Sequence, residues 1–338
     1  MHFFKNDYTY IAHKNILEAL LKYQDETYIG YGLDTHSENA KKMISSHFPN
    51  VNADIHFFVG GTILNKTVIA HALRPYEAVI AADTGHIFVH ETGAIESTGH
   101  KILTVPNVNG KVDVADIKVC INSHVDEHMV LPKMVYISET TEFGTVYTKE
   151  EIEKLYSFCK ANNLYLFIDG ARLGCALATG LVSLNDIANN CDVFYIGGTK
   201  NGALLGEALV IINDELKNNF RYIIKQNGGL YSKGFVAGIQ FEELFKDDLL
   251  VKLASNANKC AKLLETELKR LNIPTFQEGE TNLLFPIFTN EVYEKLKEIV
   301  AFDLWEDLGD RKAVRFVCNF KTTEQMVYDF ISDLEKIL

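Results

Sequence analysis

The sequence predicts an α/β protein with a mostly parallel β-sheet and a smaller α+β domain at its C-terminal end. Between residues 50 and 212, short apolar runs alternate with longer segments whose apolar residues recur at helical spacing. This alternation is typical of βαβ units, whose strands are parallel. After residue 235 the order changes to long helices, short strands and a closing helix. We therefore expect an N-terminal arm and helix over 1–30 that joins the small domain, a large domain over 31–235, and a small C-terminal domain over 236–338.

The expected strands are short apolar runs bounded by turn residues. They lie at 52–59, 78–83, 101–105, 134–138, 164–168, 193–196, 208–212, 282–287, 302–305 and 313–318. The expected helices have apolar residues three and four positions apart. They lie at 13–24, 60–73, 112–122, 147–161, 183–190, 214–222, 235–270, 290–299 and from 322 onward. The helix at 147–161 begins with a capping box formed by Thr148 and Glu151.

The composition is that of an ordinary globular chain, because its 338 residues are 47% hydrophobic and 23% charged. A net charge of -12 argues against nucleic acid or an anionic membrane as a partner. No apolar segment approaches the ~18 residues that span a bilayer, and the first residues lack the apolar stretch of a signal peptide. Six cysteines are scattered without a Cys-x-x-Cys pair. We therefore expect reduced thiols, a cytoplasmic location and no metal.

A single lysine, Lys200, lies in a glycine-rich turn between two expected strands. A lysine in such a place is partly desolvated, which lowers the pKa of its amine and makes the amine a better nucleophile. A lysine that forms a Schiff base needs this property. A solvated turn lysine and a phosphate-binding loop are the alternatives. The loop requires Ser or Thr directly after the lysine, where this chain has Asn201.

A carboxylate upstream strengthens the interpretation of this lysine. Asp169 follows the apolar run 164–168, so it stands at the carboxyl end of an expected strand. Ligands of open α/β sheets bind at that end. A lysine that holds an aldehyde and a carboxylate that keeps a pyridine nitrogen protonated are the two groups that pyridoxal phosphate requires. Lys200 and Asp169 together therefore predict a pyridoxal 5'-phosphate site.

At these residues the chain resembles a known family. The stretch Ile-Asp-Gly-Ala-Arg at 168–172 and the later turn at Thr199 and Lys200 resemble the threonine aldolase and β-eliminating lyase family. The resemblance extends from about Phe4 to the C-terminus. It implies the pyridoxal-phosphate-dependent transferase-like fold of the aspartate aminotransferase type, called fold type I. It also implies that Thr199, Lys200 and Asp169 contact the cofactor.

Two further segments fit this cofactor. An expected strand leads into Gly60, Gly61 and Thr62 and then a helix, an arrangement that binds phosphate at the helix N-terminus; a plain turn with Thr62 as the N-cap is the alternative. The family has Ser-Gly-Thr at the matching positions. His86 follows the next strand and matches the family histidine that stacks on the cofactor ring. His90 falls where the family usually has an aromatic residue.

Three residues are candidates for the substrate carboxylate. Arg315 lies among apolar residues of an expected strand, where it needs a partner such as a carboxylate; an arginine that extends from an edge strand to solvent is the alternative. The resemblance places a family arginine in this strand and a second one at Arg172, which is also a cofactor contact. The family serine that touches the carboxylate matches Asn6, which could equally be an ordinary polar residue of the arm.

The resemblance is less complete elsewhere. His128 matches a family histidine that contacts the substrate's β-hydroxyl, but Leu131 stands in place of the nearby family arginine, and a surface histidine is the alternative. The family arginine that reaches the phosphate of a neighbouring subunit is also absent, and Tyr231 and Lys233 lie nearest its position. Tyr31 lies in a segment that resembles a family loop or an ordinary turn.

Together these residues predict a pyridoxal-phosphate-dependent lyase that cleaves β-hydroxy amino acids such as L-threonine or L-allo-threonine into glycine and an aldehyde. β-Elimination, transamination and racemisation use the same groups and stay open, as does a non-catalytic homologue. We expect a small amino acid as substrate and a homodimer or homotetramer with shared active sites.

Overall fold

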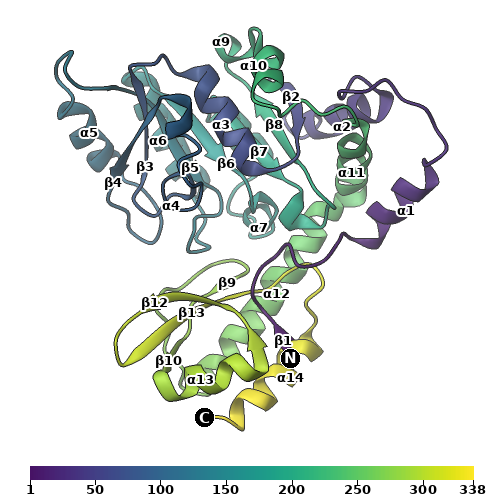
Figure 1. Cartoon of the computed structure of the whole chain (residues 1–338), viewed down its shortest axis with the longest axis vertical. Coiled ribbons are helices and arrows are strands. Elements are labelled where there is room, and N and C mark those ends of the chain that lie inside the picture. Colours follow the sequence, from purple (N-terminus) through teal and green to yellow (C-terminus); the bar gives the residue numbers. More distant parts are fainter.

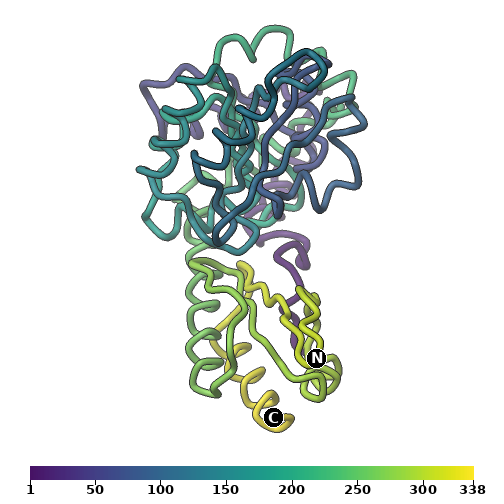
Figure 2. The backbone as a smooth tube through the Cα atoms, turned by 90° about the vertical axis from the view of Figure 1, so that its left-hand side faces the viewer, coloured from purple at the N-terminus to yellow at the C-terminus, as the bar shows by residue number.

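A computed structural model describes all 338 residues, which form two units (Figure 1). The larger unit is a β-sheet covered by helices, and the smaller unit lies below it in this view. Both chain ends lie in the smaller unit, as Figure 2 also shows. No helix combines the length and the apolar composition that a membrane crossing requires, and all six cysteines are unpaired.

The central sheet has seven strands in the order β2-β8-β7-β6-β5-β3-β4. Only β8 runs antiparallel to its neighbours, so the prediction of a mostly parallel sheet is confirmed. The strands are β2 (Asp54–Phe58), β3 (Glu77–Ala82), β4 (Lys101–Val105), β5 (Leu131–Ser138), β6 (Tyr165–Asp169), β7 (Val193–Gly197) and β8 (Glu207–Ile211).

Both faces of this sheet are buried, which explains the continuous apolar runs of its strands. In β3, for example, Ala78 and Ile80 belong to the apolar core on one face, whereas Val79 and Ala81 belong to the core on the other. The covering helices are α1 (Lys14–Lys22), α2 (Thr35–Ser45), α3 (Gly61–Ala72), α4 (His86–Val89), α5 (Val114–Asn122), α6 (Lys149–Ala161), α7 (Leu173–Leu177), α8 (Leu184–Asn189), α9 (Asp214–Lys217), α10 (Phe220–Gln226) and α11 (Phe235–Phe245).

The smaller unit packs short strands against three helices. Its strands are β1 (His2–Phe3), β9 (Leu283–Leu284), β10 (Ile287–Thr289), β11 (Val300–Ala301), β12 (Asp303–Asp307) and β13 (Arg311–Val317), and its helices are α12 (Leu249–Arg270), α13 (Asn290–Ile299) and α14 (Glu324–Glu335). β13 is the central strand, because β9, β10 and β12 all pair with it; these pairs are antiparallel, whereas β1 and β11 are parallel. The N-terminal arm joins this unit, since β1 pairs with β11 and Phe4 is buried in the core.

The apolar cores place the boundaries between the two units at other positions than residues 30 and 236, where the sequence analysis expected them. Ile16 of α1 and Phe241 of α11 belong to the core of the larger unit. The change of core falls inside α12, where Leu253 packs in the larger unit and Leu264 in the smaller one. A long amphipathic helix that serves both units has no sequence break at which to place a boundary.

The elements of the structure differ from the expected ones in several places. The helix at 214–222 is two short helices, because Asn219 adopts a left-handed conformation with φ of 59°. The strand at 282–287 is divided into β9 and β10 around Pro286, which cannot donate to a strand neighbour. Helix α2 was not expected; its polar sequence buries Ala40 and Ile44 along one face.

Candidate active site

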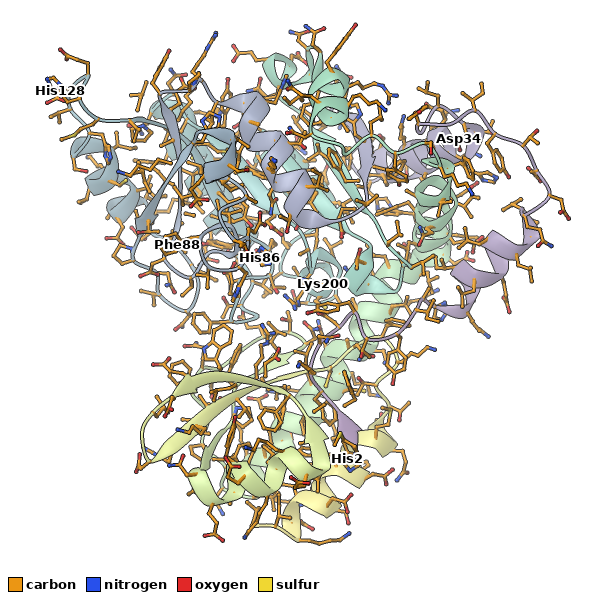
Figure 3. All side chains as sticks on the ribbon, viewed as in Figure 1. His2, Asp34, His86, Phe88, His128 and Lys200 are labelled. Atoms are coloured by element: carbon orange, nitrogen blue, oxygen red, sulfur yellow. The ribbon has the colours of Figure 1, made fainter.

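A cavity of about 240 Å³ opens at the carboxyl edge of the parallel strands. It is lined by most of the residues that the sequence predicts for the cofactor: Gly60, Gly61, Thr62, His86, Asp169, Thr199 and Lys200. These residues follow β2, β3, β6 and β7, which end at the same edge of the sheet. Figure 3 shows His86 and Lys200 at the edge of the larger unit that faces the smaller one.

The turn that carries Lys200 is fixed on both sides. Asn201 is buried, and its side-chain amide donates to the carbonyl of Gly197 at 2.6 Å. Gly202 ends the turn with φ of +99°, and a Cβ there would lie 2.6 Å from Leu253. Burial lowers the pKa of the Lys200 amine, and the charge of Arg172 lowers it further. The structure therefore presents to the cavity a lysine whose amine loses its proton more readily than usual.

Asp169 is a buried carboxylate that four donors hold in place. Oδ1 accepts from the backbone amide of Ala171 at 3.0 Å and from the hydroxyl of Tyr195, and Oδ2 accepts from Asn65 at 3.1 Å and from the hydroxyl of Tyr136. Burial acts to raise the pKa of Asp169, but the charge of His86 and these hydrogen bonds outweigh burial, so the pKa lies below its ordinary value. The carboxylate thus stays ionised and can hold a protonated ring nitrogen.

A chain of polar groups connects Asp169 to His86. The amide of Asn65 donates both to Asp169 and, at 2.8 Å, to Oε1 of Glu91. The same oxygen of Glu91 lies 2.9 Å from Nδ1 of His86. Glu91 is buried, and its Oε2 has no hydrogen-bond partner. Glu91 therefore fixes the orientation of the His86 ring at the cavity wall.

The N-terminus of α3 fits a phosphate. Gly60 is its N-cap residue and offers no side chain to the first backbone amides of the helix. A Cβ on Gly60 would meet nothing within 4 Å, so the space beside these amides is open. Unpaired amides, the positive end of the helix dipole and the hydroxyl of Thr62 are the groups that bind a phosphate. Together with Lys200 and Asp169, these residues fit pyridoxal phosphate.

Glu207 is a lining residue that the sequence motifs did not reveal. It opens β8 beside Lys200, and its Oε2 accepts from the backbone amide of Gly198 at 2.9 Å. Burial raises the pKa of Glu207 to about 7. Thr199 lies next to it and accepts from the amide of Gly206 at 3.0 Å. Glu207 therefore supports the lysine turn from the neighbouring strand.

Arg172 lies beside the cavity but has a partner from its own chain. Nε and Nη2 of Arg172 donate to the two carboxylate oxygens of Asp7 at 2.6 and 3.1 Å; the Asp7 side chain is buried, and 14% of the Arg172 side chain is exposed. Asn282 also donates to Asp7, at 3.1 Å. Arg172, which the sequence predicts to bind the substrate's carboxylate, is thus held by the carboxylate of Asp7. Its Nη1 takes no part in these two hydrogen bonds.

Arg315 retains a free donor. Its Nη2 donates to Asp303 at 2.7 Å, while its Nε is buried without a partner. Lys5 lies 3.7 Å from the same Asp303, and Asp7 lies at Arg172, so the arm passes Asn6 between the two arginine sites. Asn6 itself bonds the backbone of Tyr8 at 3.2 Å.

The structure does not bring His128 to this site. His128 is exposed in the loop before β5, at the amino end of that strand, whereas Asp169 lies beside Ser138 at the carboxyl end. At about 3.3 Å per residue, the eight residues of β5 separate the two ends by roughly 26 Å. Figure 3 shows His128 far from Lys200. The expected contact of His128 with a substrate is therefore not available within one chain.

Three comparisons with known proteins agree with this geometry. The family model described as β-eliminating lyase matches residues 16–291. The low-specificity L-threonine aldolase of Pseudomonas aeruginosa is 30% identical over 91% of this chain and 90% of its own.

Two solved structures are also similar to this chain. The structure of Leishmania major threonine aldolase is 43% identical, covers 99% of both chains and superposes with a TM-score of 0.97. An aspartate aminotransferase of Thermus thermophilus, at 14% identity and a TM-score of 0.75 over all of this chain and 92% of its own, shares the fold. The fold is therefore that of type I pyridoxal phosphate enzymes, and the chain belongs to the β-eliminating lyase family.

Proposed function

We propose that this protein is a pyridoxal-phosphate-dependent lyase that cleaves L-threonine or L-allo-threonine into glycine and acetaldehyde. The observation that carries the proposal is that Lys200, with its lowered pKa, shares one cavity with the ionised carboxylate of Asp169. The family relation and the Pseudomonas and Leishmania threonine aldolases support the choice of substrate.

The cavity residues divide the binding of the cofactor among them. Lys200 would supply the amine for its aldehyde, Asp169 would bind its ring nitrogen, and the amides of Gly60 to Thr62 would bind its phosphate, with Thr199 beside the lysine. His86, oriented by Glu91, would contact the ring. Bound in this way, pyridoxal phosphate supplies an electron sink for the pair left on the substrate's α-carbon.

The substrate's carboxylate is held by the arginines. Arg315 offers the unpartnered Nε, and Arg172 offers Nη1 while Asp7 keeps its guanidinium in position; the amide of Asn6 completes the set. With the cofactor holding the amino group, these two fixed charges on the carboxylate would determine which bond of the α-carbon is broken. In threonine, that bond must be the one between Cα and Cβ.

The experiment is a product assay on a panel of amino acids. The purified protein loaded with pyridoxal phosphate should release glycine and acetaldehyde in equal amounts from L-threonine or L-allo-threonine. A Lys200→Ala variant in the same buffer is the matched control and should release neither. Ammonia and a keto acid, an amino acid of inverted configuration, or no product at all would replace this proposal with elimination, racemisation or a non-catalytic role, respectively.

We also infer that the enzyme is a cytoplasmic homodimer or homotetramer. Large apolar side chains are exposed at and near the cavity: Val59, which lines it, is 43% exposed, and Leu204, beside the lining Leu205, is 39% exposed. Where exposed apolar side chains gather on a surface, they mark a site of interaction. Six unpaired cysteines favour a reducing compartment. Light scattering should give a mass of two or four chains, and a fully active monomer would contradict the inference.

A further inference from the structure

The imidazole of His90 is near the catalytic cavity but has no hydrogen-bond partner. Its backbone amide donates to the carbonyl of His86 at 2.9 Å, which closes α4 and fixes where the side chain begins. The two imidazole rings lie 5.6 Å apart between centroids. In His86, by contrast, Nδ1 already has a hydrogen-bond partner, Glu91. His90 thus leaves both nitrogens available to a ligand.

The groups around His90 include residues that hold the substrate in the proposed function. The charged and titratable groups that act on it are His86 from α4, Arg315 from β13 and Lys200 from the lysine turn. Lys200 marks the end of the site where the substrate's amino group is processed, and Arg315 marks the end where its carboxylate is held. Because both residues act on His90, an amino acid that spans them would pass close to the His90 ring.

The same surroundings keep His90 neutral. Partial burial lowers the pKa of His90, and the charges of His86, Arg315 and Lys200 lower it further. A neutral imidazole can accept a proton, and general bases of this kind typically contribute about 100- to 10,000-fold to a rate. His128, the sequence candidate for this task, lies at the opposite edge of the sheet.

We propose that His90 is the general base that takes the proton from the substrate's β-hydroxyl group, an inference that rests on the proposed function. An imidazole nitrogen of His90 accepts that proton. The O–H electron pair becomes the second bond of the aldehyde C=O, and the Cα–Cβ bond breaks with its pair retained on Cα. A proton then returns to Cα, so threonine yields glycine and acetaldehyde with atoms and electrons balanced.

The test uses His90→Phe, which keeps a ring of similar size but cannot accept a proton. This variant should lower kcat/KM for threonine cleavage by about 100-fold or more. Exchange of the α-proton of glycine with deuterated water needs no β-hydroxyl base, so it should change by less than about threefold. In a His90→Ala variant, added imidazole should restore part of the cleavage rate. The matched control is His47→Phe, an exposed histidine after α2 that does not line the cavity, and it should leave both rates unchanged.

A second measurement does not depend on activity. NMR titration of the histidine rings in the cofactor-free protein should give His90 a pKa below the ordinary histidine value of 6.5. If the wild type cleaves threonine and His90→Phe does so at the same rate, or loses cleavage and glycine exchange equally, His90 is not the base. If the wild type exchanges the α-proton of glycine but cleaves no β-hydroxy amino acid, the proposed function fails first, whatever the titration of His90 shows.

Discussion

Arg172 and Asp7, which are 165 residues apart in the sequence, form a buried ion pair with two hydrogen bonds. The pair joins the N-terminal arm to the loop that follows the Asp169 strand. Burial acts to raise the pKa of Asp7, but the charges of Arg172 and Lys200 outweigh it, so the pKa of Asp7 lies below its ordinary value. The arm, which belongs to the smaller unit through β1, is thereby fixed beside the cavity of the larger unit.

Changing Asp7 to Asn should destabilise the protein strongly, because Arg172 would keep its buried charge without a partner. Removal of one member of a buried pair costs about 3–5 kcal/mol of the free energy of unfolding. Denaturant unfolding at pH 7 measures the change, and Glu38→Gln, which removes an exposed ion pair with Lys41, should have a much smaller effect. Since the pKa of Asp7 is lowered, its contribution is present above its ordinary pKa of 3.8 and disappears as the pH falls through the folded value. Equal effects of the two substitutions would contradict the role of this pair.

Changing Arg315 to Ala should impair substrate binding and leave the cofactor in place. A hydrogen bond between charged groups contributes roughly 1.5–3 kcal/mol, so kcat/KM should fall by about one to two orders of magnitude. Arg311→Ala, in the same strand and exposed, is the matched control and should act like the wild type. The absorbance of bound pyridoxal phosphate should persist in both variants. Loss of the cofactor, or an equal loss with an amino alcohol that has no carboxylate, would make Arg315 a structural residue.

The raised pKa of Glu207 predicts how stability depends on pH. Between the ordinary pKa of 4.5 and the folded value of about 7, the folded protein binds more protons than the unfolded chain. The free energy of unfolding contributed by this group therefore falls as the pH rises through that range, by about 3 kcal/mol in all.

A Glu207→Gln variant removes this titration. We compare the free energy of unfolding of the cofactor-free variant with that of the cofactor-free wild type by denaturant unfolding. The difference, variant minus wild type, should be larger at pH 8 than at pH 5. Glu127→Gln, at an exposed loop position, serves as the control and should follow the wild type at both values. A wild type and a Glu207→Gln variant with parallel pH profiles would show that Glu207 titrates normally.

The parts of the site that the sequence revealed are local patterns. Asp169 ends an apolar run, Lys200 follows another run after a short glycine-rich turn, and Gly60 to Thr62 join a strand to a helix, so their places at one sheet edge follow from the strand order. His128 has the right residue type and spacing from a strand, but it stands at the wrong end of that strand. A residue that precedes a strand lies at the amino end of that strand, so the order along the chain could already have separated His128 from a site at the carboxyl ends.

The parts that the sequence did not reveal are partners from distant segments. Asp7 acts on Arg172 across the two units, and Glu91 acts on both His86 and Asn65. Each is a single acidic residue without a motif of its own. Glu91 gives one signal that could have been used, because a carboxylate five positions after a site histidine and close to a helix end is well placed to bond that histidine.

The central claim is that Lys200 holds pyridoxal phosphate in this cavity, and one measurement tests it directly. The purified protein loaded with the cofactor is reduced with borohydride, digested and analysed by mass spectrometry. We expect a pyridoxyl group on the peptide that contains Lys200, with the yellow absorbance lost on reduction, and no label at that peptide in a Lys200→Ala variant. A label on a different lysine, or no stable label in the wild type, would show that Lys200 does not hold the cofactor.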